Sequence, residues 1–256
     1  MSTLRLALRQ VGFTNRSFWR NPAAAFFTFA FPLLFLVILT SLFGNEATTL
    51  AGREIPGATF YIPAMAAFGL VTACYTNIAM SVSYQRDTGI LKRIGGTPMP
   101  RSAYLSARAL HGMLVGLVLV LLCAAFGWAF HDVQLPAGMD ALRALAAILV
   151  GGASFAALGL AATTIVPNAE AAPAIVNATI LPVLFVSDVF INTTEAPAWV
   201  EWVGEIFPVK HLVESLQAVF LPTVVAWSWL DVAVVAVWGL AGLVVATRWF
   251  RWEPSR

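Results

Sequence analysis

The sequence predicts an all-α protein that crosses a membrane several times. Hydrophobic residues make up 59% of the 256-residue chain and charged residues only 11%, whereas about 25% of the residues in an average soluble domain are charged. Apolar runs recur that are long enough to cross a bilayer, which takes a helix of about 20 apolar residues. A soluble fold would expose too much of this apolar surface to water. We therefore expect one transmembrane domain over residues 1–256.

Six apolar runs are predicted to be transmembrane helices. Short polar segments separate them, and only Pro167–Glu170 lies between the fourth and the fifth. The first run is too long for the core of a signal peptide, so we interpret it as a retained span. The expected spans lie near residues 24–44, 58–83, 103–130, 141–166, 171–191 and 227–249.

The basic residues predict which side of the membrane each connection faces. Twelve of the fifteen lysines and arginines fall in three segments: four before the first span, five in residues 84–108 and three near the C-terminus. Basic residues are retained on the cytoplasmic side of a membrane. Both termini and the connection after the second span are therefore expected to be cytoplasmic.

The segment before the first span, residues 4–20, is predicted to be an amphipathic helix at the membrane surface. Such a helix places its apolar side in the lipid and its arginines toward phosphates or a protein partner. Alternatively, the segment is helical but serves only to set the membrane orientation through its basic residues. The basic side consists of Arg5, Arg9, Arg16 and Arg20, and the apolar flank of Leu4, Leu8, Val11, Phe18 and Trp19.

The connection after the second span is unusually polar for this chain. Residues 85–100 have the sequence QRDTGILKRIGGTPMP. Ile90, Leu91 and Ile94 have helical spacing and share one face, with basic residues around them. A Gly-Gly pair then ends the helix, and two prolines prevent its continuation. This pattern predicts a short helix lying across the membrane surface, although an ordinary basic loop would have a similar charge.

The run from Arg86 to Arg93, followed by Thr97-Pro98 and Arg101, resembles the coupling-helix signature of ABC type-2 exporter permeases. It departs from that signature at Gln85, where an acidic residue is frequent, and at Ile90, where threonine is commoner. The chain length, the six expected spans and the amphipathic start also resemble this family. The resemblance implies a contact with an ATPase subunit through Arg86, Asp87, Gly89, Ile90, Leu91, Lys92 and Arg93.

The resemblance also implies partners and a location. Such permeases form a twelve-span dimer with an identical or homologous chain, bind a cytoplasmic ATPase subunit beneath each half and lie in the bacterial inner membrane. This chain has no G-x-x-x-x-G-K-[ST] phosphate loop, so we expect it not to be an enzyme. We expect no cofactor in this chain, with ATP and Mg²⁺ on the partner subunit. Membrane lipid is an expected partner and nucleic acid is not.

Residues 192–226 are predicted to form a broken outer segment before the last span. Two short helices are expected near 197–206 and 209–221, interrupted at Phe207-Pro208. Their ionisable residues must be buried in protein or face water. This segment resembles the re-entrant pair of the same family, and a surface cap is the alternative. The candidate residues for an outer gate or path are Asp188, Pro208, His211 and Glu214.

The function that the sequence predicts is export of an apolar or amphipathic substrate, such as a drug, a lipid or a glycolipid. A polysaccharide or glycoconjugate exporter of the same architecture is the alternative. A secondary transporter is less favoured, because neither inverted repeats nor a charge at the membrane midplane is evident. The three histidines are scattered, so no metal site is expected. The predicted spans contain no paired nucleophile and base at membrane depth, so the sequence does not indicate an intramembrane enzyme.

Overall fold

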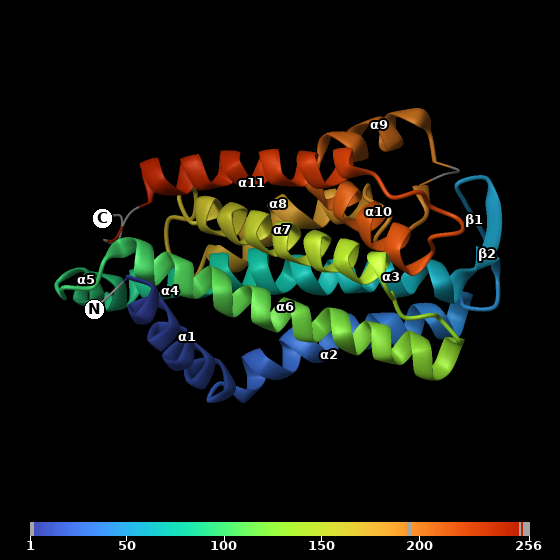
Figure 1. Cartoon of the computed structure of the whole chain (residues 1–256). Coiled ribbons are helices and arrows are strands. Elements are labelled where there is room, and N and C mark those ends of the chain that lie inside the picture. Colours follow the sequence, from blue (N-terminus) through green and yellow to red (C-terminus); the bar gives the residue numbers. More distant parts are fainter. Residues whose placement is uncertain (1–2, 194–195, 251, 253–256) are drawn as a thin grey trace.

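The computed structural model describes residues 3–193, 196–250 and 252, and it shows an elongated bundle of helices (Figure 1). Arg251 and Arg256, which contribute to the basic C-terminal end, lie outside the described residues, as does the side chain of Leu4. The same holds for residues 194–195 of the outer segment. The long apolar helices described in the next paragraph confirm the prediction of an all-α, multi-pass membrane protein.

Among the described residues, five helices are long and apolar enough to cross a membrane. They correspond to five of the six predicted spans, with boundaries that differ by a few residues. The second is continuous and consists of α3 (Gly57–Val71), one turn of π-helix (η1, Thr72–Thr76) and α4 (Asn77–Asp87). The other four are α2 (Pro22–Phe43), α6 (Arg101–His131), α7 (Met139–Ala162) and α11 (Trp229–Trp249).

The fifth predicted span is shorter than expected. Helix α8 covers Ala172–Phe185, or 14 residues, instead of the predicted 171–191. At 1.5 Å per residue it is about 21 Å long, which is less than the ~30 Å hydrocarbon core. The chain turns after it because Asp188 adopts a positive φ of 56°. The Asp188 carboxylate accepts hydrogen bonds from the backbone N–H and the hydroxyl of Thr193, at 2.6 and 2.7 Å.

A small β-hairpin connects the first two spans and was not predicted. Strands β1 (Ala47–Leu50) and β2 (Arg53–Pro56) pair antiparallel. Ala51 and Gly52 form the turn, both with positive φ, as the tight two-residue hairpin turns require. The Arg53 guanidinium donates a hydrogen bond to the carbonyl of Thr223. The hairpin is therefore joined to the segment before the last span.

The two ends of the bundle carry different elements (Figure 1). The beginning of α1 (Thr3–Trp19), the short α5 (Ile90–Gly95) and the end of α11 lie at one end. The β-hairpin, α9 (Ala198–Ile206) and α10 (Pro208–Phe220) lie at the other. The beginning of α1, α5 and the end of α11 each carry basic residues, and these three described parts lie at the same end (Figure 1).

Small residues bring the long helices into close contact. Gly239 of α11 faces Ser154 of α7 so closely that a Cβ atom built on Gly239 would lie 2.7 Å from the Ser154 Cα atom. Gly159 of α7 is similarly close to the backbone of Tyr75 in the π-helical turn. Helix packing in membranes depends on such small residues because they let two backbones approach. Helix α7 therefore packs closely against both α11 and the π-helical turn of the second span.

Candidate functional site

Two adjacent residues at the end of α4 hold the connection between α7 and α8. Arg86 is buried and donates a hydrogen bond of 2.7 Å to the carbonyl of Thr163 and a second one to the carbonyl of Val166. Its positive charge lies at the C-terminal end of α7, where the helix dipole favours a cation. The Asp87 carboxylate accepts a hydrogen bond of 3.1 Å from the N–H of Ala169. The Arg-Asp pair of the motif therefore makes contacts within the chain.

The short helix predicted after the second span is present as α5. It begins after Gly89, whose φ of 73° lies in the left-handed region that favours glycine. Leu91 is completely buried against the bundle, whereas Ile90, Lys92 and Arg93 are exposed. The surface that α5 offers to a partner consequently comprises these three exposed side chains, with Leu91 anchoring the helix from below.

Aromatic contacts join the end of α11 to the beginning of α6. The ring of Trp252 lies 5.6 Å from that of Tyr104, and the Arg101 guanidinium lies 5.4 Å from the Trp252 ring. The Tyr104 hydroxyl donates to the Gln85 Oε1 atom at 2.8 Å and accepts from the Arg108 Nε atom at 3.2 Å. Gln85, one of the two positions that depart from the family signature, thus binds a neighbouring helix.

Helix α1 confirms the predicted helix at the N-terminus and packs against the bundle. Phe18 is buried, and the centre of its ring lies 5.4 Å from the centre of the His111 ring in α6, in an edge-to-face arrangement. Leu8 and Trp19, from the same predicted apolar flank, are exposed. One side of α1 therefore faces protein. The predicted basic residues Arg5, Arg9, Arg16 and Arg20 are all exposed.

A cavity of about 600 Å³ lies between α1, α2, the π-helical turn with α4, and α6. Its walls combine apolar side chains with polar ones, including the charged Arg108. Among the described residues, the Thr14 Oγ1 and His111 Nε2 atoms at this cavity are buried and have no hydrogen-bond partner. Six representative lining residues are Phe18, Phe27, Thr76, Asn77, Arg108 and His111.

Sequence reasoning missed His111 as a site residue. A signal was present, because an ionisable residue within a membrane span indicates a functional position, and His111 lies well inside the predicted span 103–130. The contribution of α1 to the cavity was not predictable, since it depends on how α1 folds back against α6.

The predicted break in the outer segment is confirmed at Phe207-Pro208. Phe207 is extended, with φ −95° and ψ 146°, and separates α9 from α10. Pro208 occupies the first helical position of α10, where its missing N–H costs nothing. Most of α10 is buried, including Lys210. The outer segment is thus packed into the bundle, whereas its role as a gate stays a prediction.

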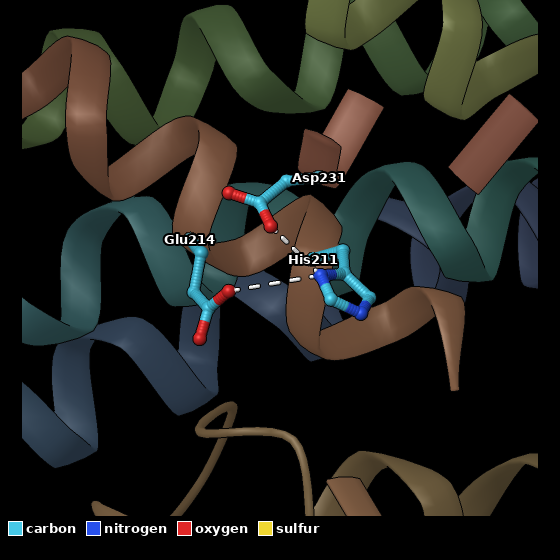
Figure 2. Close-up of side chains that lie close together, drawn as sticks. All are labelled: His211, Glu214 and Asp231. Atoms are coloured by element: carbon cyan, nitrogen blue, oxygen red, sulfur yellow. Dashed lines mark hydrogen bonds and ion pairs between the residues drawn. The ribbon is translucent and has the colours of Figure 1, made fainter. Parts of the chain in front are cut away.

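Three ionisable side chains meet where α10 crosses the beginning of α11. Figure 2 shows His211 and Glu214 of α10 beside Asp231 of α11. The His211 Nδ1 atom lies 2.9 Å from the Asp231 Oδ1 atom and 3.8 Å from the Glu214 Oε2 atom. Its Nε2 atom lies 2.9 Å from the carbonyl oxygen of Glu205. The sequence singled out His211 and Glu214 but missed Asp231, although an acid in the first turn of the last span was a signal.

The surroundings of these groups change their proton affinity. The hydrogen bond with Asp231 raises the pKa of His211, and burial opposes this rise. Burial raises the pKa of Glu214 to about 7, and the negative charge of Asp231 adds to the effect. Two other predicted residues lie outside this group. Asp188 binds Thr193, and Pro208 begins the helix that carries His211.

Comparisons with known proteins agree with this architecture. Residues 11–221, from α1 to the end of α10, match the family described as "ABC-2 type transporter". A Porphyra purpurea protein named as a candidate transport permease, ycf38, is 22% identical over 223 residues. The alignment covers 86% of this chain and 75% of that protein.

Proposed function

Because the chain belongs to the ABC-2 type transporter family, whose permeases work with a cytoplasmic ATPase subunit, we propose that it is the permease of an exporter for amphipathic substrates. Drugs, lipids and glycolipids are the substrate classes with this chemistry. The chain provides the path through the membrane, and the ATPase subunit binds ATP and Mg²⁺. The end of the bundle that carries α5, the beginning of α1 and the end of α11 is the cytoplasmic one, and transport runs outward.

The observation that carries the substrate class is the cavity at α1, α2, α4 and α6. Its volume of about 600 Å³ lies within the roughly 300–1,000 Å³ typical of small-molecule sites. Polar side chains such as Asn77 and Arg108 line the cavity, and the buried Thr14 hydroxyl and His111 Nε2 atom lack hydrogen-bond partners among the described residues. Rotation of these two side chains toward a ligand that supplies a hydrogen-bonding group is therefore favourable. The aromatic side chains favour an apolar body in the same ligand. An amphipathic molecule satisfies both.

Replacing His111 with leucine tests this proposal. The substitution keeps a similar volume and removes a buried polar atom that has no partner in the chain, so we expect stability to be unchanged or higher. Binding of an amphipathic ligand is expected to weaken about two- to tenfold, since one hydrogen bond contributes about 0.5–1.5 kcal/mol. The measurement is saturation binding of a fluorescent lysophospholipid to the purified chain in nanodiscs, with thermal unfolding measured in parallel.

Two further variants control for the position of the ligand. Thr76→Phe places a ring in the cavity and is expected to reduce binding more than tenfold. Ala125→Phe adds the same ring to an exposed position of α6 and is expected to change nothing. If the lysophospholipid does not bind saturably, or if neither cavity variant weakens it, the proposed substrate class is wrong. Saturable binding of a soluble oligosaccharide instead would favour the glycoconjugate alternative.

The exposed face of α5 is the proposed contact with the ATPase subunit. Ile90, Lys92 and Arg93 are exposed there, and Arg86, Asp87 and Gly89 position them. We expect the double charge reversal Lys92→Glu and Arg93→Glu to reduce the ATPase that co-purifies with the tagged permease at least tenfold, because like charges then face each other. Membrane insertion should be normal, since neither side chain is buried.

The matched control for this contact is Arg143→Glu, at the other end of the bundle. Arg143 forms a partly exposed pair with Asp140, and ion pairs near the surface contribute little to stability. Normal co-purification of the ATPase with the α5 double variant would contradict the assignment of α5. A loss with both variants would instead indicate a general effect of charge on the complex.

The second permease chain is proposed to cover α8. Asn177 of α8 is exposed on the surface of the single chain, and a polar amide is unfavourable in contact with lipid. Pairing of two chains over this face would bury the amide in protein or place it in a hydrated path. This arrangement supports the twelve-span dimer that the family resemblance predicts.

A further inference from the structure

The two ring nitrogens of His211 both face hydrogen-bond acceptors. The Nε2 atom lies 2.9 Å from the backbone carbonyl of Glu205, which only accepts, so Nε2 carries a hydrogen. The Nδ1 atom lies 2.9 Å from the Asp231 carboxylate, which also accepts when ionised. A neutral imidazole has a single N–H and cannot satisfy both. With both carboxylates ionised, the position between Nδ1 and the carboxylates therefore suits one positive species, either a proton or a metal ion.

We propose that His211, Glu214 and Asp231 bind a divalent transition-metal ion of the Zn²⁺ type. Their ligand atoms all lie within 4.8 Å of one another. Ligands bonded at about 2.1 Å to one tetrahedral ion lie about 3.4 Å apart. The distances from Nδ1, 2.9 Å to Asp231 and 3.8 Å to Glu214, lie on either side of this value. The ligand oxygens of Glu214 and Asp231 lie within 4.8 Å of each other, so side-chain shifts of up to about 1.4 Å would admit the ion.

The chemistry of the three groups also fits this class of ion. An imidazole nitrogen with two carboxylate oxygens suits Zn²⁺ and its first-row neighbours better than Ca²⁺, which prefers oxygen ligands alone. The two carboxylates supply the negative charge that a divalent cation needs. Three protein ligands leave a fourth position for water.

The surroundings of His211 resemble those of histidines that bind metals. Such histidines donate their second ring N–H to a carbonyl or carboxylate, which fixes the ring orientation, and the Glu205 carbonyl takes this role. Glu214 is 33% exposed, so an ion can reach the group from the surface. The nearby Lys210 and Asp188 carry opposite charges and act on Glu214 in opposite directions, with Lys210 the stronger of the two.

A bound ion would connect two elements that are otherwise held by packing. His211 and Glu214 belong to α10, and Asp231 belongs to the first turn of the last span. The ion would fix the outer segment against α11 and make the position of α10 depend on metal availability outside the cell.

The test is metal binding by the purified full chain in nanodiscs after treatment with a chelator. Equilibrium dialysis with Zn²⁺ is expected to give one ion per chain, and Co²⁺ is expected to show the visible absorption of a four-coordinate site with nitrogen and oxygen ligands. His211→Gln, Glu214→Gln and Asp231→Asn are each expected to weaken Zn²⁺ binding at least tenfold. Ca²⁺ should not compete at equal concentration.

His131→Gln is the matched control, because His131 also lies at this end of the bundle, at the last position of α6. It should bind Zn²⁺ as the wild type does. The proposal is wrong if the folded wild-type chain binds no stoichiometric Zn²⁺, or if the three ligand variants bind it as well as wild type. A doubly protonated His211 ring at neutral pH, detected by nitrogen NMR in the presence of Zn²⁺, would show that a proton occupies the position instead. None of these outcomes depends on transport, so they leave the permease assignment unaffected.

Discussion

Replacing Arg86 with alanine is expected to lower the free energy of unfolding by about 3 kcal/mol. Hydrogen bonds from charged groups each contribute about 1.5–3 kcal/mol, and Arg86 donates to the carbonyls of both Thr163 and Val166. Alanine would leave these carbonyls without a donor and remove the cation at the end of α7. The connection between α7 and α8 should then open, and α5 should lose its position.

Unfolding of the purified chain by SDS titration measures this effect. Arg86→Lys is expected to restore only part of the stability, because a single ammonium group lacks the planar fork that reaches two carbonyls. Arg93→Ala, in the same segment but exposed, is the matched control and should unfold as the wild type does. Equal stability of the Arg86 and Arg93 variants would mean that the contacts of Arg86 contribute nothing to folding.

A leucine at Gly239 is expected to separate α11 from α7. Even one carbon added at this position would lie 2.3 Å from the Ser154 Oγ atom and 2.7 Å from its Cα atom. The clash involves backbone, so a change of rotamer cannot relieve it. Overpacking of a well-packed contact typically costs about 1–3 kcal/mol, and we expect the upper end of this range.

The measurement is the temperature at which the purified protein loses its monodisperse peak in size-exclusion chromatography. Ala241→Leu adds the same side chain to an exposed position of α11 and should leave this temperature unchanged. Gly239→Ala should have an intermediate effect. If Gly239→Leu behaves as Ala241→Leu does, the close contact between α7 and α11 is not required for stability.

The sequence predicted those parts of the fold that depend on local patterns. Uninterrupted apolar runs predicted α2, α6, α7 and α11, because only a helix satisfies its backbone within lipid. The apolar spacing and the glycine pair predicted α5. The break between α9 and α10 followed from Pro208, which cannot donate a backbone hydrogen bond. The hairpin at residues 47–56 was missed because strands of four residues give too little alternation to recognise.

The parts that were not predicted depend on contacts between distant segments. Arg86 was expected on a surface that faces a partner, but it reaches residues about 80 positions further along the chain. Asp231 joins His211 across 20 residues, because α10 folds back against α11. Helix α8 ends early because Asp188 binds Thr193 rather than continuing an apolar run. These contacts produce no periodic pattern in the local sequence, so the sequence alone did not predict them.

The contact of Trp252 with the beginning of α6 has a practical consequence for handling the protein. A fluorescent domain or affinity tag placed a few residues after Trp252 would be attached close to a ring that lies against Tyr104 and Arg101. It would crowd the same end of the bundle that carries α5. The tip of the β-hairpin offers a better attachment site, since Ala51 and Gly52 are exposed and a side chain built on Gly52 would meet open space. A label inserted there would report on the protein from the opposite end and leave the α5 surface accessible.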